Sequence, residues 1–247
     1  MRRFFFLARS VLVMMVRDRA ALIGTLLIPL VLLLVLGLVN PGASIGEVSA
    51  AAWLTVGVLV MGMLSGAVDG DMAWLTMTRD RGILWRVRAS PLPPATLLLA
   101  YTGARLVLVL LKAALIVGVG MLVFGVRLQW DGLLPALGLV VLGGAVFLAL
   151  GQAVAAAAPT AGAATVTANL IFFPVIFTSN LFIAGLPPQL EAITRWNPAY
   201  LLVELLRAVL LGVEPGQALW INLVGLLIYG LLGIIVAIRF FQWEPKR

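Results

Sequence analysis

The chain has 247 residues, of which 63% are hydrophobic and only 11% are charged, and its formal net charge is +7. Soluble domains average nearer half apolar and a quarter charged, so this composition excludes a water-soluble domain and indicates a polytopic membrane protein. The sequence contains no cysteine and no histidine, which excludes disulfides and metal sites built from those side chains. We expect residues 1–247 to form a single membrane domain without a metal.

Six apolar stretches meet the ~20 residues that a membrane-spanning helix needs. They are continuously apolar rather than alternating, which favours helices over a barrel. The fold class predicted is therefore an all-α membrane protein with six transmembrane helices. The predicted spans are Ala20–Val39, Ala50–Val68, Ala104–Val126, Leu133–Ala156, Ala163–Ile183 and Leu219–Ile238.

Lysine and arginine side chains are concentrated in the amino-terminal segment, in the connection between the second and third spans, and in the tail. The opposite side of the membrane holds only Arg127, Arg195 and Arg207. This asymmetry predicts that both termini are cytoplasmic. Because the basic residues flank spans instead of forming one face, no nucleic acid partner is expected.

Residues 2–19 precede the first span and have an amphipathic pattern. Their arginines, Arg9 and Arg17 among them, cluster on one arc of a helix, and apolar side chains lie opposite. This pattern predicts a helix lying in the cytoplasmic membrane interface, in contact with lipid. A basic anchor that only sets the topology is the alternative. The first apolar run is long enough to span and lacks a small-residue cleavage site after it, so we expect no cleavable signal peptide.

Residues 69–95 form the longest predicted cytoplasmic connection. Asp69 and Asp71 suit the start of a short helix, and Ile83 and Leu84 would share one of its arcs. The prolines of the SPLPP sequence at 90–94 would end it. A solvated loop is the alternative reading, although several large apolar side chains here are costly to expose to water.

Residues 157–162 form a very short predicted cytoplasmic turn, and residues 184–216 form the longest external connection. Within the latter, Pro198 suits the first turn of a helix and Gly212 its end. This stretch is too short and too charged for a seventh span. It predicts a short re-entrant helix that dips into the outer leaflet, one of a pair that could form a lid.

Catalytic chemistry is missing from the sequence. It has no GxxxxGK[ST] phosphate-binding loop, so the chain cannot bind ATP by that route, and without histidine or cysteine it lacks the common nucleophile–base pairs. The predicted spans also contain no carboxylate, which argues against ion-driven transport by this chain alone. We therefore predict that it is not an enzyme and that a partner supplies the energy.

Charged and polar side chains inside the spans leave two readings each open. Arg105 and Lys112 share a face of the third span and either anchor the topology or contact substrate. Polar and Phe residues of the fifth span either line a pathway for hydrophobic cargo or pack helices together. Met61 and Met63 of the second span belong to the same pathway hypothesis.

Three segments carry a resemblance to a known family: RDRAALIGTLLIPLVLLLVLG at 17–37, RDRGILWRVRASPLPP at 79–94 and NPAYLLVELLRAVLLG at 197–212. Together they resemble the permease subunits of type-2 ATP-binding-cassette (ABC) exporters, particularly the bacterial multidrug or antibiotic-resistance branch. The resemblance implies a multi-pass protein of a bacterial or archaeal cytoplasmic membrane that exports hydrophobic or amphipathic cargo. It also implies a dimer with a second permease copy or paralogue, docked to two ABC ATPase subunits that bind the ATP and Mg. No cofactor is expected in this chain.

The resemblance also implies roles for individual residues. The amino-terminal helix and the connection between the second and third spans would dock the ATPase, and spans two and five would line the pathway. Trp85 and Arg86 depart from the family pattern, in which acidic residues are common. The residues implied for ATPase coupling are Asp80, Arg81, Gly82, Leu84, Trp85, Arg86, Ser90, Pro91, Arg9 and Arg17. Those implied for the pathway are Met61, Met63, Asn169, Phe172, Phe173, Phe177 and Asn180, and those for an external gate are Asn197, Pro198, Glu204 and Arg207.

Three alternatives remain at this stage. The first is export of a lipid or a lipid-linked glycan. The second is a stand-alone secondary transporter or channel, and the third is a membrane anchor or sensor for an ATPase that moves no cargo.

Overall fold

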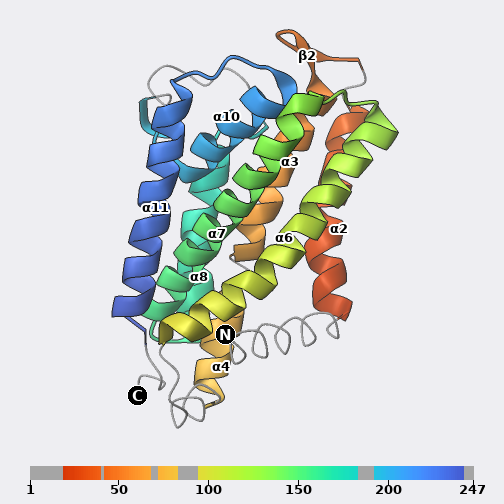
Figure 1. Cartoon of the computed structure of the whole chain (residues 1–247). Helices are drawn as coiled ribbons and strands as arrows, with labels where there is room; N and C mark the ends of the chain where they lie inside the picture. Colours follow the sequence, from red (N-terminus) through yellow and green to blue (C-terminus); the bar gives the residue numbers. More distant parts are fainter. Residues whose placement is uncertain (1–18, 40–41, 68–71, 83–93, 183–191, 242–247) are drawn as a thin grey trace.

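The structure is a computed structural model that describes residues 19–39, 42–67, 72–82, 94–182 and 192–241. The predicted interfacial helix over 2–19 lies almost wholly outside these ranges. The described helices form one bundle with a small β-hairpin at one end (Figure 1). They are α2 (Arg19–Val39), α3 (Ala50–Ser65), α4 (Ala73–Asp80), α6 (Pro94–Phe124), the 3₁₀ turn η2 (Trp130–Gly132), α7 (Leu133–Ala157), α8 (Ala161–Phe177), α10 (Pro198–Leu211) and α11 (Leu219–Arg239).

Each predicted span corresponds to a helix, but the helices differ in length. Among the described residues, three helical stretches are long and apolar enough to cross a membrane: Leu99–Phe124, Trp130–Ala157 and Leu219–Arg239. The helices α2, α3 and α8 supply shorter apolar stretches. With 16 residues, α3 rises only about 24 Å, which is less than the ~30 Å of a typical hydrocarbon core.

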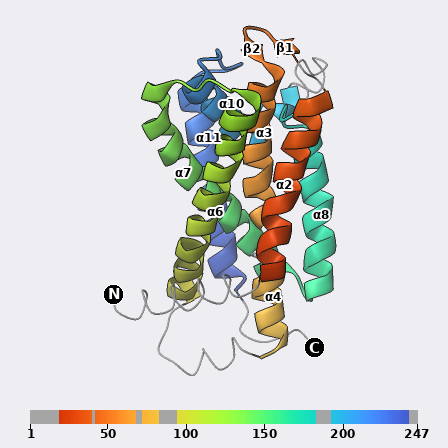
Figure 2. The same ribbon diagram turned by 90° about the vertical axis from the view of Figure 1, so that its right-hand side faces the viewer.

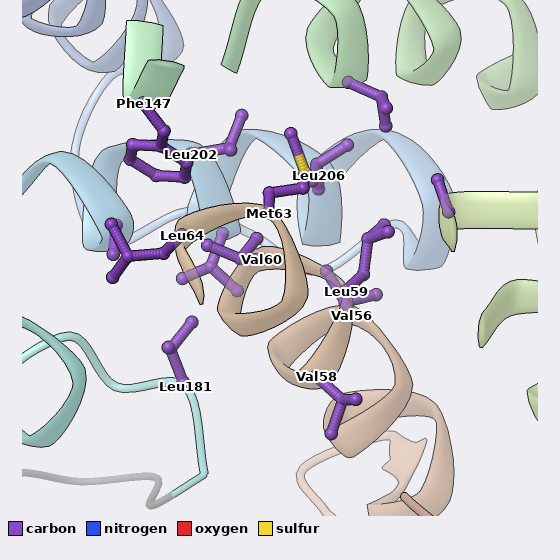
Figure 3. Packing of buried hydrophobic residues seen from close by; sticks show 14 of the residues in the cluster. Val56, Val58, Leu59, Val60, Met63, Leu64, Phe147, Leu181, Leu202 and Leu206 are labelled. Carbon is purple, nitrogen blue, oxygen red and sulfur yellow. The ribbon is translucent and has the colours of Figure 1, made fainter. Parts of the chain in front are cut away.

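Helix α3 lies at the centre of the bundle, where it contacts α2, α6, α7, α8 and α10. It is apolar all round, and nearly all its side chains are buried, as expected for a helix enclosed by others. Figure 3 shows Val60, Met63 and Leu64 of α3 close to Leu202 and Leu206 of α10. The surrounding helices α2, α8 and α11 instead expose many large apolar side chains, which suits a lipid environment.

Helices α7 and α11 pack side by side through small residues (Figure 1). A Cβ added to Gly233 of α11 would lie 3.0 Å from the backbone of Ala149, and one added to Gly230 would lie 3.0 Å from Val146. Such close approach of two backbones is how apolar helices gain contact inside a membrane, where the hydrophobic effect supplies little.

The bundle has two distinct ends, seen from a second side in Figure 2. The hairpin end holds β1 (Ser44–Ile45) and β2 (Val48–Ser49), paired antiparallel in the register Ser44↔Ser49, together with α10. Ser49 also caps α3 by accepting a hydrogen bond from the Ala52 amide. The α4 end is opposite, and α4 extends beyond the other helices there (Figure 2).

Two predicted helix boundaries are wrong. The third helix begins at Pro94 rather than at Ala104, because a proline that ends one element is also suited to the first turn of the next. The fifth ends at Phe177 instead of continuing to Ile183. There the chain turns through Asn180, which has a φ of +56° and so cannot continue the helix.

The predicted helix between the fifth and sixth spans is confirmed. Asn197 accepts a hydrogen bond from the Ala199 amide, Pro198 is the first helical residue, and α10 ends at Gly212 with a φ of +70°. The predicted partner helix of a re-entrant pair falls largely within 183–191, outside the described residues.

Candidate functional site

Helix α4 packs against α7 and α8 at one end of the bundle. Met72, directly before α4, and its Leu75 form a small buried cluster with Ala153 and Ala155 of α7 and with Ala168 and Ala237 of α8 and α11. The partly buried Val154, Val236 and Phe241 pack against this cluster. Polar contacts also hold α4 in place.

Arg79 provides such a contact in the last turn of α4. Its side chain is 2% exposed, and its Nη1 donates to the Ala158 carbonyl at 2.9 Å and to the Ala155 carbonyl at 3.5 Å. Its Nη2 donates to the Pro159 carbonyl at 3.2 Å. Ala155 lies in the last turn of α7 and the other two residues directly follow the helix. The last C=O groups of a helix have no intrahelical partner, and a cation is favoured there.

The burial of Arg79 was not expected from the sequence, in which it is one of several basic residues of a predicted cytoplasmic segment. Its partners are backbone carbonyls 76 to 80 positions away. A carbonyl has no side-chain identity, so no sequence pattern points to it. The run of alanines at 155–158, which gives the guanidinium access to the helix end, is the one usable signal.

The residues that follow Arg79 begin the predicted ATPase-coupling set. Helix α4 ends at Asp80, and the part of the predicted helix that holds residues 83–87 lies outside the described residues. Arg81 is exposed, and Gly82 has a φ of +69°, a conformation that ends the helix and favours glycine. The Asp80 side chain and residues Leu84, Trp85, Arg86, Ser90, Pro91, Arg9 and Arg17 lie outside what the structure describes.

At the hairpin end, Asn197 joins α10 to α8. Besides capping α10, its Nδ2 donates to the Val175 carbonyl at 2.8 Å and to the Thr178 hydroxyl at 2.9 Å. This donation satisfies a carbonyl in the last turn of α8. The sequence predicted Asn197 only as part of a gate motif and did not predict this link.

Glu204 and Arg207, two of the predicted gate residues, are three positions apart in α10 and lie together. Their closest oxygen and nitrogen are 3.9 Å apart, and Arg207 is 1% exposed. Its Nη1 and Nη2 donate to the carbonyls of Asn180 and Leu181 at 2.9 and 3.0 Å. Its guanidinium also lies 3.4 Å from the centre of the Trp53 ring, a cation–π contact.

Two further contacts complete this cluster. The Glu204 Oε2 accepts a hydrogen bond from the Gly216 amide at 2.8 Å, so the carboxylate also holds the connection between α10 and α11. Gly57 of α3 allows the chain at Leu181 to approach, since an added Cβ would lie 2.1 Å from the Leu181 oxygen that Arg207 binds. Segments from α3, α8, α10 and the α10–α11 connection therefore meet around one buried arginine.

The sequence matches the model of the ABC-2 type transporter family over residues 2–211, which is most of the chain. The chain belongs to this family. It is the membrane component of an ABC-2 type transporter, a multi-pass protein that has no ATPase activity of its own. No curated protein sequence matches the chain.

The predicted pathway residues of this ABC-2 permease do not come together within the chain. Met63 is buried in the core and Met61 is half-buried beside it. On α8, Asn169, Phe173 and Phe177 are exposed on the outer face. Phe172 packs against the core, with its ring centre 5.7 Å from that of Phe173, and Asn180 lies in the turn after α8.

Lys112 of the ABC-2 permease faces the interior of the bundle. It is buried, and its Nζ donates to the Gly62 carbonyl of α3 at 2.9 Å. Together with Arg105 it lines a cavity of about 30 Å³ between α2, α3 and α6, room for little more than a water molecule. The two readings of Lys112, a topology anchor and a substrate contact, both stay predictions.

Metal binding is not indicated among the described residues, which include no group of three or more acidic side chains that could hold an ion.

A polar contact also links two of the long helices inside the bundle. The Gln152 Nε2 of α7 donates to the Thr102 hydroxyl of α6 at 2.9 Å and so links two spanning helices.

Proposed function

We propose that this chain is the permease subunit of an ATP-driven exporter that moves hydrophobic or amphipathic small molecules outward, of the multidrug or antibiotic-resistance type. It would act as a dimer with a second permease copy or paralogue and with two copies of a separate ATPase. Membership of the ABC-2 family carries the proposal, because such permeases generally pair with ABC ATPase subunits. The proposed location is the cytoplasmic membrane of a bacterium or archaeon.

The proposed orientation places the α4 end in the cytoplasm. Arg79, Arg81 and Arg239 lie at this end, since Ala237 near the end of α11 belongs to the same buried cluster as Met72 and Leu75. Positively charged residues favour the cytoplasmic side. Both termini would then be cytoplasmic, and the hairpin end with α10 would face outward.

The proposed coupling site is the segment that begins at the end of α4, with Asp80, Arg81 and Gly82 at its start. Arg81 is exposed, as a docking residue must be. In this mechanism ATP brings the two ATPase subunits together, and α4 and the amino-terminal helix transmit the movement to the bundle. Cargo must bind the inward and outward states differently for hydrolysis to drive export.

The proposed external gate is the cluster around Arg207, with Asn197, Pro198 and Glu204. Its contacts join α8, α10 and the start of the α11 connection, so a change in α10 would alter all three. The proposed pathway lies between two permeases and is lined by α8, whereas α3, which was also predicted to line it, is enclosed within the bundle. The exposed Asn169, Phe173 and Phe177 of α8 offer an apolar face with one amide for that interface.

The first test is affinity purification of the tagged chain from native membranes, with mass spectrometry of the proteins that co-purify. A stoichiometric ABC ATPase supports the proposal. In proteoliposomes, stimulation of that ATPase by hydrophobic drugs rather than by lipids would support the cargo class, and stimulation by lipids alone would move the assignment to a lipid or glycan exporter. Cargo flux without ATP would contradict ATP-driven export.

The coupling site has its own test in two variants. Asp80→Lys reverses a charge at the proposed docking site, and Gly82→Pro cannot adopt the observed positive φ. We expect both to abolish transport while the protein still inserts, whereas Asp131→Lys, at an exposed acidic residue of the hairpin end, is the matched control. Normal export by both variants would remove this docking assignment.

A further inference from the structure

We propose that Arg79 is the positioning residue that makes α4 and the turn between α7 and α8 move as one body when the ATPase acts. This inference rests on the proposed function and adds to it the residue that conveys movement from the coupling segment to the spanning helices.

The hydrogen bonds of Arg79 connect α4 to the turn between α7 and α8. Arg79 lies one residue before Asp80, where the proposed coupling site begins, and its guanidinium reaches the carbonyls of Ala158 and Pro159. Those carbonyls lie in the short connection between α7, which ends at Ala157, and α8, which starts at Ala161. A displacement of α4 therefore acts directly on the junction of two long helices.

The chemistry of the contact requires arginine. The planar guanidinium directs its two terminal nitrogens to different carbonyls at once, whereas a lysine ammonium is a single point donor. The side chain is also almost fully buried, so its hydrogen bonds do not compete with water. The two donors of the guanidinium thus fix the direction of α4 as well as its distance from the end of α7.

The apolar contacts at the start of α4 are less directional than the hydrogen bonds of Arg79. Met72 and Leu75 lie in a cluster with alanines, against which the partly buried Val154, Val236 and Phe241 pack. Thr76 and Thr78 donate hydrogen bonds to the carbonyls of Met72 and Leu75, next to or within α4. Without the hydrogen bonds of Arg79, we expect a tilt of α4 to move α7 and α8 less.

The expected consequence is uncoupling. In Arg79→Met, which keeps a long apolar stem, the ATPase still co-purifies and still hydrolyses ATP. The amount of cargo moved per ATP falls roughly tenfold, the size of a typical coupling between two sites. Arg79→Lys retains one donor and lies between Arg79→Met and the unchanged chain. Arg127→Met, which replaces an exposed arginine of the hairpin end, leaves the ratio unchanged.

A covalent link separates a mechanical role from a general loss of stability. Because the chain has no cysteine, Met77→Cys on the exposed face of α4 and Gly162→Cys at the start of α8 add the only two thiols. A Cβ at Gly162 meets no atom within 4 Å. Bifunctional thiol reagents of increasing length can then join the two elements in the assembled complex.

The decisive measurement is the ratio of transport to hydrolysis in proteoliposomes before and after this link is formed in the Arg79→Met background. We expect the link to restore coupling there and to leave the Arg79 background unchanged. A normal ratio in Arg79→Met, or no recovery on linking, would overturn the inference. Should Arg79→Met fail to insert, the same two outcomes are read from Arg79→Lys, and absence of any ATPase from the unchanged chain contradicts the proposed function instead.

Discussion

Arg79 and Arg207 lie at opposite ends of the bundle and have much in common. Both are almost fully buried, and both donate to backbone carbonyls just beyond the last turn of a spanning helix, α7 for Arg79 and α8 for Arg207. The Glu204 carboxylate and the Trp53 ring lie around Arg207. Around Arg79 lie the carbonyls of Ala155, Ala158 and Pro159.

This difference predicts different roles for the two arginines. A buried carboxylate left without its cation is strongly unfavourable, so the cluster around Arg207 either stays whole or collapses. Carbonyls at a helix end can instead turn to water or to a neighbouring amide at smaller cost. Arg207 should therefore matter most for stability, and Arg79 most for the transmission of movement.

The largest expected effect is that of Arg207→Met on the free energy of unfolding. It leaves Glu204 buried beside two unsatisfied carbonyls, so we expect a loss of about 3–5 kcal/mol, against about 1–3 kcal/mol for Arg79→Met. Thermal unfolding of both purified variants checks this order. Adding Glu204→Gln to Arg207→Met should recover part of the loss, and an equal loss for the two single variants would break the comparison.

Gly57→Ala tests the same cluster from α3. Its Cβ would lie 2.1 Å from the Leu181 oxygen that Arg207 binds, so the backbone must move apart. We expect a loss of about 1–3 kcal/mol from overpacking. The matched control is Gly24→Ala in α2, where an added Cβ meets nothing within 4 Å. A thermal midpoint equal to that of the control would mean that the approach at Gly57 is not required.

Asn197→Ala removes the cap of α10 and the link to α8. Loss of a helix cap alone lowers stability by about 1 kcal/mol, and the lost bonds to Val175 and Thr178 add to this. Hydrogen exchange of the α10 amides should rise near Ala199 and remain unchanged at the α4 end. Equal protection of Ala199 in both proteins would show that Asn197 is dispensable as a cap.

Gln152→Leu should have the smallest effect on the free energy of unfolding. It serves as a reference variant in the middle of the bundle, away from both ends. It removes one side-chain hydrogen bond between α7 and α6, and such bonds inside membrane proteins average about 0.6 kcal/mol. Transport per ATP should not change, because neither arginine is touched. A loss as large as that of Asn197→Ala would show that the middle of the bundle is as sensitive as its ends.

Much of the fold could be predicted from the sequence, because a long run of apolar residues indicates a spanning helix without reference to any distant residue. Each span has its helix, and the bounds of α10 follow from Asn197, Pro198 and Gly212, which are caps and breakers that act within a few residues. The Glu204–Arg207 pair was likewise visible from its spacing. Its place at an external gate stays a prediction.

The features that could not be predicted depend on partners far away in the chain. The turn through Asn180 that ends α8 early is held by Arg207, 27 residues later. The position of Arg79 depends on carbonyls of α7, and the requirement for glycine at 57 depends on the backbone at Leu181. In each case the partner is main chain, which any residue type supplies, so the contact leaves no pattern in the sequence.

The β1–β2 hairpin has a practical consequence for work on living cells. Its turn contains Gly46, with a φ of +59° and no atom within 4 Å of an added Cβ, next to the exposed Glu47. A short peptide epitope inserted between these two residues would project away from the helices without disturbing their packing. Antibody staining of intact cells would then report how many copies have reached the surface, and which side of the membrane the hairpin occupies.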